Sequence, residues 1–284
     1  MKRLMGSAVV LLFLSFFVVL QGAEETEGAQ AMKETRLGVT VENAFIEASA
    51  GYENQTGIDS TWTGNLGFNH GLPLNRDWGL GFQWGGRVTL RDDEPDWLAG
   101  VGVFQRGVDF NGYQMMWGLQ GFWQNTHQKV DLAHIKPTLA WQVDDMNYWG
   151  LTGLWGKNED RAKFRVPFLY KQEGVDQAAA FWGHRWREDL ATEFMGGYQF
   201  NDIDEPVVGA TLSWQLDPEL SLNLSGSSNF AGDYLASVGV GFDLGANSRT
   251  DRLIKVTQDD ADDYTPLPID SMTQPRYNTV KLFR

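Results

Sequence analysis

Histidine, serine and aspartate are the residue types that could carry catalytic chemistry in this chain, because the sequence contains no cysteine. A serine or an aspartate beside a histidine can act as a nucleophile with its base. The candidate pairs are Ser60 or Asp59 with His70, and Asp131 with His134. Serine and aspartate are frequent here, so such pairs arise by chance and no catalytic site is predicted.

Metal and cofactor sites are not predicted either. The histidines never occur at metal-ligand spacing on one strand or helix. They are His70, His127, His134 and His184. The acidic run 259–263 could attract Ca²⁺, but it lacks the glycine and the closing glutamate of an EF-hand loop. A solvated acidic segment is therefore expected there.

The chain begins like an exported protein. Lys2 and Arg3 precede an apolar run at 8–20, and Ala23 is followed by two glutamates. The apolar run is shorter than the roughly 20 residues of a membrane-spanning helix. Residues 1–23 are therefore predicted to be a cleavable signal peptide. The alternative is an uncleaved N-terminal anchor.

Composition excludes several classes of protein. No later stretch has 18 or more consecutive apolar residues, which excludes a bundle of membrane helices. The formal net charge is −14, and it becomes −16 when removal of residues 1–23 takes away Lys2 and Arg3. Nucleic acid is an unexpected partner, because phosphate binding needs basic surface. The 32 glycines, 12 tryptophans and 17 phenylalanines suit many short strands with aromatic belts.

Alternation of apolar and polar residues is the main structural signal. After a flexible leader at 24–36, residues 37–244 repeat runs of roughly 10 residues with period two, each followed by a turn. We count twelve runs, near residues 45–53, 60–72, 78–90, 97–104, 113–123, 132–143, 147–156, 175–186, 190–200, 208–216, 220–225 and 236–244. The run at 147–156 fits either register, and Pro137 predicts a bulge or break. Short connections fall at every second junction, as in an up-and-down membrane barrel.

A soluble sandwich would also show period two, so the polar face of the strands decides between the two folds. That face is rich in Gly, Ser, Thr and Gln, and it holds nearly all the charges within the runs. On a lipid-facing position a Lys or Arg would cost roughly 2–4 kcal/mol. The residues predicted to line the lumen are Glu47, Gln83, Arg87, Lys136, Arg185, Glu193 and Asp243. Trp62, Trp78, Trp97, Trp123 and Trp141 lie on the apolar face, several near strand ends, as in an interfacial girdle.

The last run adds a family resemblance. Ser237, Gly239, Phe242 and Leu244, within SVGVGFDL, resemble the C-terminal signal that the barrel-assembly machinery recognises in bacterial outer-membrane barrels, although about 40 residues follow it here. Residues 45–244 also resemble uncharacterised porin-like families in pattern and turn spacing. The resemblance implies an all-β, antiparallel up-and-down transmembrane barrel of about 12 strands in a Gram-negative outer membrane.

A porin-like channel for passive diffusion of small solutes is the expected function, with outer-membrane lipid and the assembly machinery as partners. A barrel of this size predicts a narrow or closed pore. The alternatives are a closed structural or adhesive barrel, a soluble secreted carbohydrate-binding β-sandwich, and a barrel hydrolase. The polar, acidic tail at 245–284 is expected to be extended, and either to touch the envelope wall or to plug the lumen.

Overall fold

A computed structural model describes most of the chain beyond the leader. The described residues are 43–55, 58–91, 95–126, 131–157, 159–161, 169–200, 204–230, 232–244, 254–257, 264–268 and 277–282. The predicted signal peptide, the leader, His127 and the acidic run 259–263 lie outside them. Within the described residues, no helix is long and apolar enough to cross a membrane.

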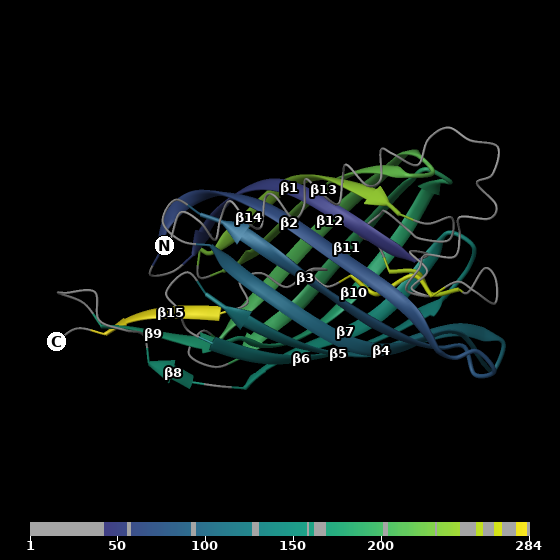
Figure 1. The fold of residues 1–284 in the computed structure, drawn as a ribbon, viewed down its shortest axis with the longest axis horizontal. Helices are drawn as coiled ribbons and strands as arrows, with labels where there is room; N and C mark the ends of the chain where they lie inside the picture. Colours follow the sequence, from purple (N-terminus) through teal and green to yellow (C-terminus); the bar gives the residue numbers. More distant parts are fainter. Residues whose placement is uncertain are drawn as a thin grey trace, which may run out of the picture. The chain divides into compact units, whose positions relative to one another are not determined.

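Twelve strands close into one antiparallel barrel (Figure 1). They are β1 (Ala44–Gln55), β2 (Ile58–Asn75), β3 (Leu80–Leu90), β4 (Asp96–Phe110), β5 (Tyr113–Asn125), β6 (Asp131–Gln142), β7 (Asn147–Lys157), β10 (Asp176–Arg187), β11 (Leu190–Phe200), β12 (Glu205–Asp217), β13 (Leu220–Asn229) and β14 (Tyr234–Asp243). Each strand pairs with its neighbours in this order, and β14 returns to β1, with Phe45 opposite Asp243. The predicted fold class and strand number are confirmed.

A small second sheet lies outside the barrel wall. It consists of β8 (Glu159–Arg161), β9 (Leu169–Gly174) and β15 (Tyr277–Leu282), in the order β15-β9-β8. The first two strands belong to the connection between β7 and β10, and β15 belongs to the C-terminal tail (Figure 1). The long connection at 157–174 therefore contains strands, and the end of the chain pairs with it.

The two ends of the barrel differ. Short turns join β2 to β3, β4 to β5, β6 to β7, β10 to β11 and β12 to β13 at one end, where β1 also begins and β14 ends. We call this the turn end and the opposite one the loop end. The β4–β5 turn is made by Asn111 and Gly112, with φ of 54° and 83°. Positive φ at both central residues is the conformation of the type I′ hairpin turn, which favours Asn-Gly.

The pleat places alternate side chains inside and outside the barrel. In β7, whose register was open, Tyr148 and Leu154 are buried, whereas Trp149 and Leu151 are exposed. The odd-numbered aromatic and aliphatic residues of this strand therefore form part of the outer surface.

Pro137 does not produce the predicted bulge. Strand β6 runs without interruption, and its register to β7 is the same on both sides of the proline, from Ile135 opposite Trp155 to Thr138 opposite Thr152. Proline has no N–H to donate to the ladder. The interruption of the β6–β7 pairing covers Lys136 and Pro137 only, and the Thr152 hydroxyl donates to the Pro137 carbonyl oxygen at 3.2 Å.

Candidate functional site in the barrel interior

Charge is divided sharply between the two faces of the barrel wall. Away from the strand ends, the outward positions of the twelve barrel strands carry no Lys, Arg, Asp or Glu. Large apolar and aromatic side chains are exposed there, among them Leu119, Val208 and Val238. Exposed tryptophans lie near the loop end, as with Trp62 and Trp97, and near the turn end, as with Trp78.

All residues predicted to line the lumen lie on the inward face of their strands. Gln83, Lys136 and Glu193 are almost completely buried. Glu47, Arg87 and Asp243 are half-buried, and Arg185 is exposed close to the turn end. Their role in lining a conducting path stays a prediction.

A buried polar network joins the interior faces of three strands. The Tyr148 hydroxyl donates to Glu193 Oε2 at 2.5 Å, and Glu193 has no solvent exposure. The Lys136 ammonium interacts electrostatically with the same carboxylate. A buried carboxylate needs such partners, since desolvation of an isolated charge is costly. The network therefore holds a compensated pair of opposite charges inside the barrel.

Two segments of the C-terminal tail, 254–257 and 264–268, lie inside the barrel. The main chain of Leu267 contacts inward-facing amides of β2, β3 and β5. Its carbonyl oxygen accepts hydrogen bonds from Asn69 Nδ2 at 2.7 Å, Gln83 Nε2 at 3.1 Å and Gln120 Nε2 at 3.4 Å. Its N–H donates to Gln83 Oε1 at 2.8 Å. The Lys136 ammonium donates to the Pro268 carbonyl oxygen at 3.5 Å.

A second tail segment binds the inner face of β4. The Arg106 Nε–H donates to the Lys255 carbonyl oxygen at 2.8 Å, and the Gly107 N–H donates to the Val256 carbonyl oxygen at 3.1 Å. The apolar tail residues Ile254, Val256, Tyr264 and Leu267 join one buried cluster with inward residues such as Phe104, Met116, Phe181 and Met195. Of the two expected positions of the tail, the described segments occupy the lumen.

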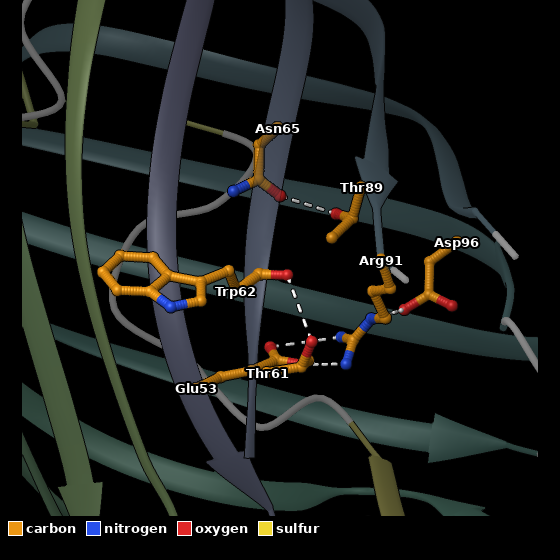
Figure 2. Close-up of polar contacts among 7 residues, drawn as sticks. All are labelled: Glu53, Thr61, Trp62, Asn65, Thr89, Arg91 and Asp96. Atoms are coloured by element: carbon orange, nitrogen blue, oxygen red, sulfur yellow. Dashed lines mark hydrogen bonds and ion pairs between the residues drawn. The ribbon is translucent and has the colours of Figure 1, made fainter. Parts of the chain in front are cut away.

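An arginine cluster stands near the loop end of the interior (Figure 2). The Arg91 guanidinium contacts both carboxylate oxygens of Glu53 and bonds Asp96 Oδ2 through Nε at 3.1 Å. All three side chains are at most 10% exposed. Two residues before Arg91, Thr89 on β3 donates to Asn65 Oδ1 at 2.7 Å (Figure 2). The cluster ties the β3–β4 connection to β1.

The sequence pattern did not indicate this cluster, since Arg91 and Asp96 fell in an expected loop. It also did not indicate Asn69 and Gln120, whose inward parity was the available signal.

The candidate catalytic pairs are not assembled. Ser60 and His70 lie ten residues apart along β2, which is about 33 Å. The Ser60 hydroxyl donates to Asn54 Oδ1, and Asp131 Oδ1 accepts a bond from a neighbouring asparagine. His134 points inward, opposite in parity to Asp131. The side chain of Asp59 lies outside the described residues. Among those that are described, no group of three or more His, Asp or Glu could hold a metal ion.

The residues that resemble an assembly signal lie at the closure of the barrel. Ser237 and Gly239 face inward in β14, Phe242 faces outward, and the Leu244 N–H donates to the Ala44 carbonyl oxygen at 2.9 Å. This strand is the one that pairs with β1. Recognition by the assembly machinery stays a prediction.

Comparison with known proteins gives a family and a fold. A family model described as a family of unknown function (DUF6666) matches residues 42–234. A NanC porin structure is 10% identical, with a TM-score of 0.51, over 70% of this chain and 100% of that one. A KdgM porin is 11% identical, with a TM-score of 0.47, over 69% and 98%. Outer membrane phospholipase A from Escherichia coli is 10% identical, with a TM-score of 0.45, over 70% and 92%.

No curated protein sequence matches the chain. At these identities the likeness concerns the fold, and the predicted resemblance to porin-like outer-membrane barrels is confirmed at that level.

Proposed function

The chain belongs to DUF6666, a family of unknown function, and we propose that it is a porin-like barrel of the outer membrane that passes small polar solutes. The observation that carries this proposal is the division of charge across the wall. A soluble sandwich turns its apolar faces inward. Here the apolar faces point outward, and the charged residues of the strand interiors point inward.

The height of the outer apolar band supports a membrane location. On β5, Tyr113 and Trp123 are both exposed and lie ten residues apart. At about 3.3 Å per residue and a tilt of about 40°, this separation projects to about 25 Å along the barrel axis. A band of about 25 Å flanked by aromatic girdles is typical of outer-membrane barrels.

The interior supports passage of polar solutes. Arg87 and Glu47 face the lumen on β3 and β1, and Arg91 with its two carboxylates stands at the loop end. Rings of charged side chains set the selectivity of such pores. Mixed charge in a barrel of twelve strands fits a narrow path for small polar or ionic solutes.

The test is conductance of the mature chain, residues 24–284, in a planar bilayer. We expect brief discrete steps, and Arg87→Glu should shift the reversal potential toward cation selectivity. Arg187→Glu is the matched control, because Arg187 is exposed at the turn end and pairs with Asp189. Stable insertion without steps at any voltage would replace the channel with a closed structural barrel.

A further inference from the structure

We propose that the inward cluster of Asn69, Gln83, Gln120 and Lys136 is a binding site for extended polypeptide, and that the chain's own segments 254–257 and 264–268 are its ligand and a removable plug. The binding site stands on the contacts alone. The consequence for transport rests on the proposed channel function.

The contacts identify the ligand class as peptide main chain. Gln83 both donates to and accepts from Leu267, as a neighbouring strand would. Lys136 and Arg106 donate to the carbonyl oxygens of Pro268 and Lys255. These side-chain bonds from the barrel wall are made to main-chain atoms. Such bonding tolerates many sequences, so selectivity must come from the shape of the apolar contacts.

Two glycines provide that shape. A Cβ on Gly71 would stand 1.7 Å from the Tyr264 carbonyl oxygen, so the tail backbone occupies the space that a side chain would fill. A Cβ on Gly118 would stand 2.2 Å from Leu267 Cδ1. The wall is therefore recessed where the tail runs closest to it. The recess at Gly118 accepts an aliphatic side chain at the position of Leu267.

The tail behaves as a ligand of the barrel because the barrel does not need it for closure. The twelve wall strands pair with one another around the full circle, and segments 254–257 and 264–268 add no strand to that circle. The segments are held by neutral hydrogen bonds, a lysine contact, an arginine contact and apolar packing. The two segments can therefore leave this binding site and return to it without opening the wall.

A disulfide trap in the full chain tests whether Leu267 lies beside Gly118 inside the barrel. The protein has no native cysteine, so Gly118→Cys with Leu267→Cys introduces one possible pair. Leu267 Cδ1 lies 2.2 Å from the Gly118 Cβ position, which places the two cysteine Cβ atoms within roughly 5 Å, near the ~3.8 Å of a disulfide. Leu119→Cys with Leu267→Cys is the matched control, because Leu119 faces outward.

We expect rapid disulfide formation in membranes for the first pair and none for the second. Failure of the first pair in a heat-modifiable, folded barrel would overturn the proposal, as would equal formation in both pairs.

Removability is tested by competition with a free peptide of residues 254–268. Excess peptide should slow disulfide formation in the Gly118→Cys, Leu267→Cys protein. A peptide carrying Leu267→Asp should be at least tenfold less potent, because the charge would enter an apolar recess. Equal potency of the two peptides, or no effect of either, would overturn a removable ligand.

Conductance of the same protein separates the plug from the channel. Oxidation should abolish the brief openings, and reduction should restore them. Equal conductance in both states would overturn the plug. A protein that forms the disulfide but never conducts, oxidised or reduced, would support the peptide site and refute the proposed channel.

Discussion

Replacing Gln83 with methionine should loosen the tail by a calculable amount. Methionine has similar length and no amide, so Gln83→Met removes the bond to the Leu267 carbonyl oxygen at 3.1 Å and the bond from its N–H at 2.8 Å. A typical intramolecular hydrogen bond contributes about 0.5–1.5 kcal/mol. Loss of both gives about 1–3 kcal/mol, which is roughly a 5- to 150-fold larger population of released tail at about 1.4 kcal/mol per tenfold.

Hydrogen exchange measured by mass spectrometry on the peptide that spans 264–268 reports this population directly. Where reclosing is faster than exchange, the exchange rate is proportional to the open fraction. The Leu267 amide should therefore exchange faster in Gln83→Met by the same roughly 5- to 150-fold factor.

Gln177→Met is the matched control. Gln177 is an equally buried inward glutamine, and its amide contacts Met195 Sδ instead of the tail. Unchanged exchange at Leu267 in Gln83→Met would refute the reasoning. An equal acceleration in Gln177→Met would refute it too, because the effect would then be general loosening of the barrel.

Three further predictions test the recess, the outer face and one turn. Gly71→Ala should lengthen channel openings by displacing the tail backbone, whereas Gly64→Ala should not, since nothing lies within 4 Å of its Cβ position. Leu119→Arg, at an outward mid-strand site, should cost roughly 2–4 kcal/mol in urea unfolding from lipid vesicles, and no loss would mean that this face does not meet lipid. The Asn147 side chain and then backbone N–H groups hold the pKa of Asp144 below its usual value. The charged form is the one bonded, so this contribution to the turn is complete above about pH 3.9 and is lost as pH falls through the lowered pKa, as an NMR titration of the carboxyl would show.

The barrel wall could be predicted from the sequence because its physics is local. Each strand has one face toward an apolar medium and one toward a polar interior, so the period of two is written into runs such as 208–216. The same rule placed Lys136 and Glu193 on the inward face. It failed to settle 147–156, where Gly150 and Gly153 weaken the contrast between the two parities. It also overstated the effect of Pro137, because β6 keeps the same register to β7 on both sides of the proline.

The binding position of the tail could not be predicted from the sequence, because recognition of the main chain leaves little trace in the side chains of the ligand. The contacts of Leu267 and Lys255 use their backbone carbonyl oxygens, which every residue possesses. The matching donors, Asn69 and Gln120, occur among many polar residues of the inward face. The ion pairs in Figure 2 could not be predicted from the sequence either, because Arg91 meets Glu53 and Asp96 only after three strands have been aligned.

The closure of β14 onto β1 sets an order of events during biogenesis. The described tail segments follow β14 in the sequence, and β14 ends at the turn end, whereas β15 pairs with β9 beside the loop end. While the seam between β1 and β14 is open, segments 254–257 and 264–268 can be laid into the wall from the side. Once Phe45 and Asp243 have paired, the wall has no gap, and the same segments can enter only end-on through a mouth. Pairing of β1 with β14 therefore ends the period in which the tail segments can enter from the side.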